Sequence, residues 1–163
     1  MSYRVLTGCT GNICRSPMAE VVLRQVAEQA GMDILVDSAA TTGWELGNPI
    51  DHRAVKVLRR GGYSPQVRGA QKIMLSHIED YDLILAMTRE HYREIERLSR
   101  QVDPHKRAQI HLWRAFSTDA DQREGDDLDV PDPWYGGMED FEETLEILED
   151  ATENLLEFLD QSA

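Results

Sequence analysis

The chain has 163 residues, 41% of them hydrophobic, which is enough for one domain with a buried core and too few for two. Its net charge of −13 is uneven, because residues 1–118 carry 16 Lys and Arg against 13 Asp and Glu, whereas residues 119–163 carry 1 against 17. A surface this acidic argues against nucleic acid as a partner, since phosphate-backbone binding depends on clustered cations. No run of about 18 apolar residues is present, so we expect no membrane insertion. Two cysteines and no apolar signal segment at the N-terminus predict a reduced, cytoplasmic chain.

Short apolar segments alternate with helical patterns along the chain. The sequence predicts strands at residues 4–7, 34–36, 81–87 and 110–113, the last with the weakest pattern. It predicts a first helix that stops at Gly31, a second that is capped by Asp51 and stops at residues 61–62, and a third over residues 89–100. Apolar residues between 141 and 158 predict one long closing helix with an acidic outer face.

Alternating strands and helices predict an α/β protein in which a parallel sheet is covered by helices on both faces. Ligands of such sheets bind beyond the carboxyl ends of the strands. Residues 117–132 are polar and acidic, and we expect them to form a surface loop, where functional side chains often lie.

The most informative segment, residues 9–17, reads Cys-Thr-Gly-Asn-Ile-Cys-Arg-Ser-Pro and joins the first strand to the first helix. We expect Ser16 to cap this helix and Pro17 to take its first position. The free N–H groups and the dipole of the helix then favour a bound anion. The helix dipole and the Arg15 cation both act on Cys9, and thiols in such surroundings ionise near neutral pH.

Two explanations of this segment compete. A cysteine six positions before an arginine is a common spacing. Taken alone, Cys9 and Arg15 are explained equally well as a small buried thiol and an exposed charge. Gly11 and Asn12 change the balance, because both tolerate left-handed backbone angles and so turn successive N–H groups inward. The segment therefore predicts a thiolate beside a phosphate-binding loop.

A second segment, residues 130–137, places two prolines and two aromatic residues around Asp132. Alone, it is explained most simply as a rigid turn with a solvent-facing carboxylate. Together with the thiolate loop, it predicts a carboxyl group that is held in place, partly desolvated and able to act as a general acid.

These motifs resemble the low molecular weight protein tyrosine phosphatases over essentially the full length of the chain. The resemblance rests on the loop and the Met-Ala-Glu that follows it, on residues 36–41 and 43–47, on Asp51 with Arg53, and on residues 132–136. It implies a single domain over residues 1–163 with a four-stranded parallel sheet, helices on both faces, and a phosphate-binding loop after the first strand.

The resemblance also implies roles for individual residues: Cys9 as nucleophile, Arg15 as clamp of the phosphoryl oxygens, and Asp132 as general acid. It implies Asn12 and Ser38 as supports of the loop. The predicted substrate-binding residues are Thr10, Gly11, Asn12, Ile13, Cys14, Ser16 (which also stabilises the thiolate), Trp44, Trp134 and Tyr135.

The expected partners follow from these roles. A deep slot lined by the three aromatic residues favours phosphotyrosine over the shorter phosphoserine. We expect tyrosine-phosphorylated proteins as substrates, inorganic phosphate as product and inhibitor, and a monomer or weak dimer. We expect no cofactor and no metal, because the five histidines show no His-x3-His or similar grouping.

Two positions depart from the family pattern. Val67 stands where the family often has a histidine that supports the loop Asn, and Thr88 stands where it often has an Asp after the third strand. Both predict weaker support of the loop and slower catalysis, not its loss.

Three other functions compete with this one. A thiol-dependent arsenate reductase shares the architecture, but disulfide-relay versions need further cysteines and none follows Cys14. Versions that use a small-molecule thiol stay open as an alternative, although Asp132 would then have no obvious leaving group to protonate. A protein-arginine phosphatase of the same fold is associated with Thr at the position of Ile13. A non-catalytic phosphate-binding module needs neither a nucleophile nor an acid.

Overall fold

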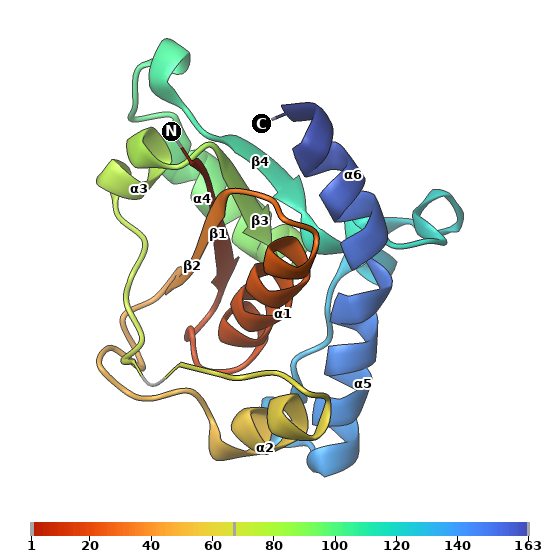
Figure 1. Ribbon diagram of the computed structural model, residues 1–163. Helices are drawn as coiled ribbons and strands as arrows, with labels where there is room; N and C mark the ends of the chain where they lie inside the picture. Colours follow the sequence, from red (N-terminus) through yellow and green to blue (C-terminus); the bar gives the residue numbers. More distant parts are fainter. Residues whose placement is uncertain (1, 67, 163) are drawn as a thin grey trace.

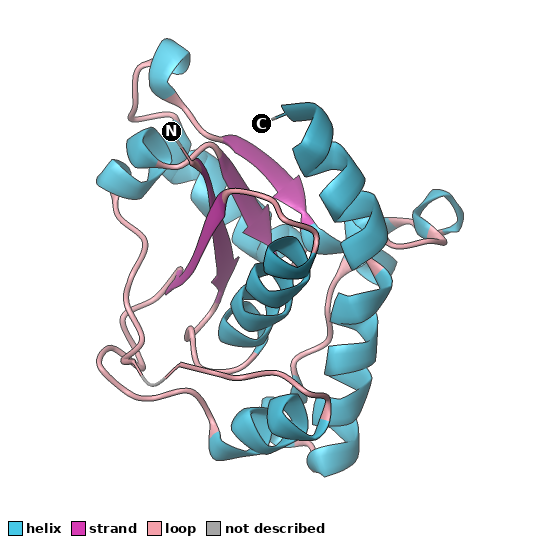
Figure 2. Ribbon diagram, viewed as in Figure 1, coloured by secondary structure: helices cyan, strands magenta, loops and turns pink. Residues whose placement is uncertain are grey.

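The computed structural model describes residues 2–66 and 68–162, and its centre is a four-stranded sheet (Figure 1, Figure 2). The strands are β1 (Tyr3–Cys9), β2 (Ile34–Ala40), β3 (Leu83–Ala86) and β4 (Gln109–Leu112), in the order β2-β1-β3-β4 and all parallel. All four predicted strands are confirmed, with β1 and β2 longer than the sequence indicated.

Helices cover both faces of the sheet, as predicted (Figure 1). Strand residues alternate between two cores: Val5 and Leu85 belong to one, whereas Leu6 and Ile84 belong to the other. The first core is closed by α1 (Arg15–Gln29), α2 (His52–Arg60), α5 (Met138–Asp150) and α6 (Thr152–Ser162). The second is closed by α3 (Leu75–Asp80) and α4 (Arg89–Ser99). Short 3₁₀ turns lie at Pro104–Lys106, Trp113–Phe116, Ala120–Gln122, Gly125–Leu128 and Pro133–Tyr135.

The strand register brings the carboxyl ends together. Cys9 at the end of β1 pairs with Ala40 at the end of β2, and Gly8 pairs with Ala86 at the end of β3. The loops that follow these strands therefore meet at one edge of the sheet, which is where α/β proteins bind ligands.

Some helix boundaries differ from the predicted ones. The cap of α2 is confirmed, because the Asp51 carboxylate accepts a hydrogen bond from Arg53 N (2.8 Å). The predicted start of α1 is wrong: Cys14 is the cap, and Ser16 and Pro17 are the second and third helical residues. The chain enters the helix earlier because the Ser16 side chain is engaged within the loop and does not cap the helix.

The C-terminal segment forms two helices where one was predicted. Helix α5 ends at a cap on Ala151, and the Thr152 hydroxyl donates to Glu149 O (2.7 Å) as α6 begins. The apolar spacing continues through this break, so the sequence pattern does not reveal it. The short helix α3 was also missed, since six residues carry too little periodicity. No helix in the described ranges is long and apolar enough to cross a membrane.

Candidate active site

The loop between β1 and α1 curls around the sulfur of Cys9. Asn12 adopts the left-handed conformation (φ 60°) that the sequence predicted for the turn. Gly11 is closely packed, because a Cβ there would lie 3.1 Å from Glu45 Cγ and would push that side chain aside. These two residues let the chain turn within six positions from the end of β1 to the first residue of α1.

Three donors surround Cys9 Sγ. The backbone N–H groups of Asn12 and Ser16 approach it at 3.3 and 3.4 Å, and the Ser16 hydroxyl lies 3.0 Å away. Asn12 Nδ2 donates to Ser16 Oγ (2.8 Å), and toward a Cys9 thiolate the serine hydroxyl can only donate. Donors that converge on sulfur stabilise a thiolate.

A buried network holds Asn12 from behind. Its Nδ2 also donates to Ser38 Oγ (2.8 Å), and Ser38 in turn donates to the Glu20 carboxylate (2.6 Å). Arg68 binds both Glu20 and Ser38, and Gln71 N donates to Asn12 Oδ1 (3.1 Å). The loop Asn is therefore anchored through several partners, while Val67, the departure predicted to weaken its support, lies outside the described residues.

Arg15 joins the loop to the segment that carries Asp132. Its side chain is buried, Nη1 donates to Val130 O (3.0 Å), and Nη2 lies 3.6 Å from Asp132 Oδ2. The Asp132 side chain is 41% exposed, so more than half of its surface is covered, which agrees with the expected partial desolvation. The carboxylate accepts a hydrogen bond from Trp134 N (3.0 Å), which holds it in place.

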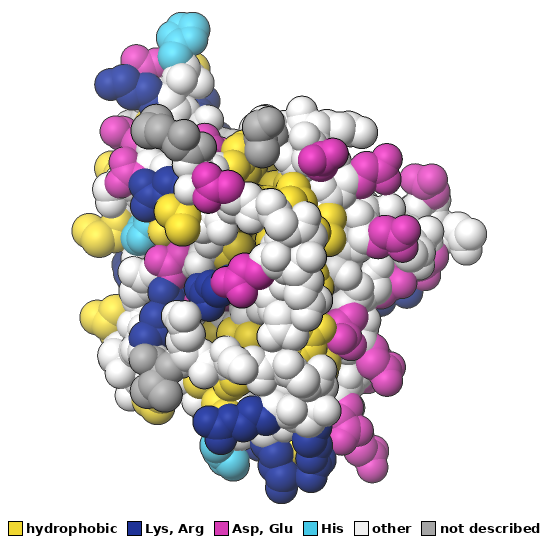
Figure 3. Space-filling view, viewed as in Figure 1, with side chains coloured by type: hydrophobic (Ala, Val, Ile, Leu, Met, Phe, Trp, Pro, Cys, Tyr) yellow, Lys and Arg dark blue, Asp and Glu magenta, His cyan; other side chains and the backbone are white. Residues whose placement is uncertain are grey.

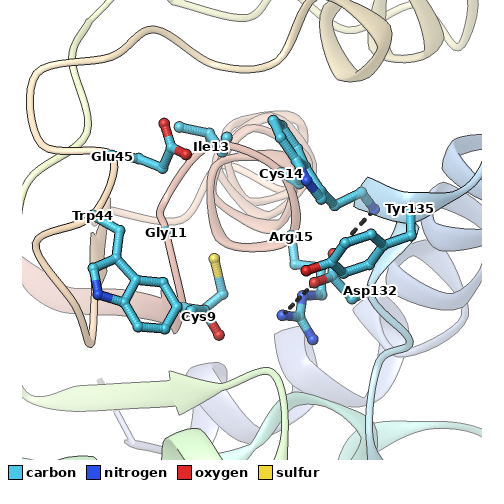
Figure 4. Close-up of a pocket in the computed structure, with 11 residues that line it drawn as sticks. Cys9, Gly11, Ile13, Cys14, Arg15, Trp44, Glu45, Asp132 and Tyr135 are labelled. Atoms are coloured by element: carbon cyan, nitrogen blue, oxygen red, sulfur yellow. Dashed lines mark hydrogen bonds and ion pairs between the residues drawn. The ribbon is translucent and has the colours of Figure 1, made fainter.

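Most of the predicted site residues line one pocket of about 210 Å³. In Figure 4, Trp44 and Tyr135 stand on opposite sides of it with Cys9 between them. Trp44 and Tyr135 are 79% and 90% exposed, and so can contact a substrate outside the loop. The predicted residues that line the pocket are Cys9, Thr10, Gly11, Ile13, Cys14, Arg15, Trp44, Asp132, Trp134 and Tyr135. Asn12, Ser16 and Ser38 are buried and do not line it.

One residue of the pocket wall and one contact of the loop were missed. Glu45 lines the wall, although its segment was noted only as part of a motif. His91 on α4 is buried, and its Nε2 is hydrogen-bonded to Thr10 Oγ1 (2.7 Å). Burial and, secondarily, the Arg15 cation lower the pKa of His91 to about 3, so it is neutral at physiological pH. A lone histidine gives no sequence signal for this role.

Thr88, the second departure, caps α4. Its hydroxyl accepts a hydrogen bond from His91 N (3.2 Å), which satisfies one of the free N–H groups at the start of this helix. Thr88 thus supports α4, the helix whose His91 contacts the loop.

Arg53 ties α2 to the segment after Asp132. Its guanidinium donates to Gly136 O (3.0 Å) and Trp134 O (3.2 Å) and is paired with Asp51. It also lies over the Trp134 ring, 5.5 Å from the centroid. The sequence pointed to Asp51 with Arg53 as a motif but not to this tether.

The fold and the pocket define an α/β protein with a cysteine surrounded by donors in the loop between β1 and α1, beside a buried arginine and an exposed carboxylate. Within residues 2–66 and 68–162, no three His, Cys, Asp or Glu residues are grouped to hold a metal ion.

Comparison with known proteins identifies the family. The model of the family described as low molecular weight phosphotyrosine protein phosphatase matches residues 4–163. A low molecular weight protein-tyrosine-phosphatase of Streptomyces coelicolor is 44% identical over 160 residues, which cover 96% of this chain and 93% of the relative. The chain therefore belongs to the low molecular weight protein tyrosine phosphatase family and is a hydrolase of that class.

Solved structures agree with the fold. A protein tyrosine phosphatase from Entamoeba histolytica, crystallised with Hepes in its active site, superposes with a TM-score of 0.87 at 32% identity and covers 99% of both chains. A Drosophila arginine phosphatase superposes with a TM-score of 0.85 at 27% identity, covering 95% of this chain and 96% of its own. Since both superpose equally well, the fold by itself does not choose between tyrosine and arginine phosphatase chemistry.

Proposed function

We propose that this chain hydrolyses phosphotyrosine in proteins, and small aryl phosphates, through a phosphocysteine intermediate on Cys9. The observation that carries the proposal is the set of three donors on Cys9 Sγ in a pocket that also holds Arg15 and Asp132. A protein that only binds phosphate needs neither an activated thiol at Cys9 nor a general acid at Asp132.

The first step transfers the phosphoryl group to sulfur. The Cys9 thiolate attacks phosphorus, an S–P bond forms, and the O–P bond to the tyrosine oxygen breaks. Arg15 and the loop N–H groups hold the phosphoryl oxygens, and both interactions strengthen as charge builds in the transition state. Asp132 gives its proton to the departing phenolate, which leaves as neutral tyrosine.

The second step hydrolyses the intermediate. Asp132, now a carboxylate, takes a proton from water as that water attacks phosphorus, and the S–P bond breaks. Inorganic phosphate is released, the Cys9 thiolate is restored, and Asp132 is again protonated. Every proton and electron pair is accounted for by these two residues and water, so the mechanism requires neither a metal nor a cofactor.

The pocket walls set the substrate class. Ile13 presents an apolar side chain to the substrate, which suits an aryl ester better than a cationic phosphoguanidine. Trp44 and Tyr135 flank an opening suited to a long aromatic phosphoester (Figure 4). We place the enzyme in the cytoplasm, acting on tyrosine-phosphorylated proteins as a monomer or weak dimer.

The test is turnover of a chromogenic aryl phosphate in the presence of a chelator. We expect metal-independent hydrolysis, and we expect Cys9→Ser to abolish it while phosphate and vanadate still bind, because Arg15 and the loop amides remain. Residual hydrolysis by Cys9→Ser, or dependence of the parent enzyme on added metal, would contradict the mechanism.

A further inference from the structure

A second hollow lies outside the catalytic pocket, along α2. It has a volume of about 470 Å³ and is lined by Pro49, Ile50, His52, Val55, Lys56, Arg59 and Arg60. Ile50 and Val55 are half-buried and form an apolar floor, whereas the basic side chains stand exposed at the rim. We call this surface the α2 groove.

The α2 groove is positively charged on a protein that is strongly negative. Basic side chains gather over α2 in Figure 3, at the bottom of the view, while acidic side chains dominate the side formed by α5 and α6. Arg60 has one acidic neighbour, Glu142 of α5, at 3.6 Å. Lys56 and Arg59 have no carboxylate within 4.0 Å among the described residues, so their charges are available to a ligand.

The groove adjoins the catalytic pocket. Asp51 N donates to Ile13 O (2.8 Å), which ties the start of α2 to the phosphate-binding loop. Arg53 ties the first turn of α2 to the segment that follows Asp132. From Arg53 to Arg59 the helix rises about 9 Å, a distance that an extended peptide spans in about three residues.

We propose that the α2 groove docks an acidic segment of the phosphoprotein substrate, with carboxylates about three to six positions from the phosphotyrosine. The proposal rests on the proposed function, since the phosphotyrosine in the pocket places the flanking segment. Carboxylates pair with Lys56 and Arg59, and an apolar side chain between them covers Ile50 and Val55. An anionic membrane fits less well, because acidic side chains of α5, among them Glu142 beside Arg60, adjoin the groove.

The experiment compares phosphotyrosine peptides with Glu, Ala or Lys at the flanking positions, placed on either side of the phosphotyrosine. For at least one side, we expect kcat/KM to be roughly 5- to 30-fold higher with Glu than with Lys, the range for a few exposed ion pairs. The preference should shrink at high salt. Lys56→Glu with Arg59→Glu should remove or invert it. The matched control, Arg93→Glu with Arg97→Glu, reverses two exposed charges on α4, on the other face of the sheet, and should preserve it.

A small aryl phosphate separates this proposal from the proposed function, because it has no flanking residues. If the enzyme hydrolyses it but the flanks make no difference on either side, docking is wrong and the phosphatase mechanism stands. If no phosphotyrosine substrate is hydrolysed, the proposed function fails, and docking is still tested by an NMR titration with the acidic phosphotyrosine peptide. Shifts centred on amides 52–60 support docking. Absent or scattered shifts, or binding of anionic lipid vesicles through α2 in place of the peptide, overturn it.

Discussion

Replacement of Asp132 by Asn separates proton transfer from electrostatics in this pocket. The amide is nearly isosteric and still accepts the hydrogen bond from Trp134 N, so the segment should keep its geometry. It has no proton to give to the leaving group. A general acid contributes about 10²- to 10⁴-fold, which corresponds to about 3 to 5 kcal/mol in the activation free energy.

The electrostatic part of the change is smaller and has the opposite sign. Asp132 lies 3.6 Å from Arg15 and competes with a phosphoryl group for it, so Asn should strengthen phosphate binding. Because the carboxylate is 41% exposed, water screens the interaction. An exposed pair is worth about 0–1 kcal/mol, so the inhibition constant of phosphate should fall by no more than about fivefold.

The assay is kcat/KM for a series of aryl phosphates, since this ratio reports the first, phosphoryl-transfer step. We expect the loss to be largest for basic phenolates and small for leaving groups that need no proton. Asp126→Asn, a change at a 92% exposed carboxylate of the same loop region, is the matched control and should leave both quantities unchanged. An equal loss across the series, or phosphate binding that weakens, would refute the role of Asp132 as a general acid.

Three further predictions concern the loop and its neighbours. Ile13→Thr should raise activity on phosphoarginine relative to phosphotyrosine, and an unchanged ratio would place the selection elsewhere in the pocket. Mild peroxide should inactivate the enzyme through a Cys9–Cys14 disulfide that a dithiol reverses, and Cys14→Ser should recover less completely; peptide mass analysis checks the link. Burial raises the pKa of the Cys14 thiol, so disulfide closure should speed up as pH rises. Because His91 has a folded pKa of about 3, below its unfolded value, its contribution to stability is full above about pH 6.5 and is lost as pH falls toward 3. Between pH 7 and 5 the parent should lose about 2 kcal/mol more unfolding free energy than His91→Asn in urea titrations, and equal losses would contradict a buried neutral histidine.

Much of the fold was predictable because its signals are local. Apolar runs marked the four strands, and Asp51 marked the start of α2. The sequence was less informative where a residue could form more than one local structure. Ser16 is a good capping residue, but its hydroxyl is used for Cys9, so the helix starts at Arg15. The break at Ala151 leaves the apolar spacing intact and is set by contacts that the pattern does not contain.

The sequence by itself determined the chemistry of the loop, since Cys9, Gly11, Asn12 and Arg15 lie within seven consecutive residues and their backbone preferences shape it. Only the tertiary structure decided what faces that loop. Val130 O reaches Arg15 across 115 positions of sequence, and His91 reaches Thr10 across 81. Contacts at such separations depend on how strands and helices pack, for which no short segment carries a signal. The position of Asp132 beside Arg15 is of the same kind, because it depends on how two segments far apart in the sequence pack together.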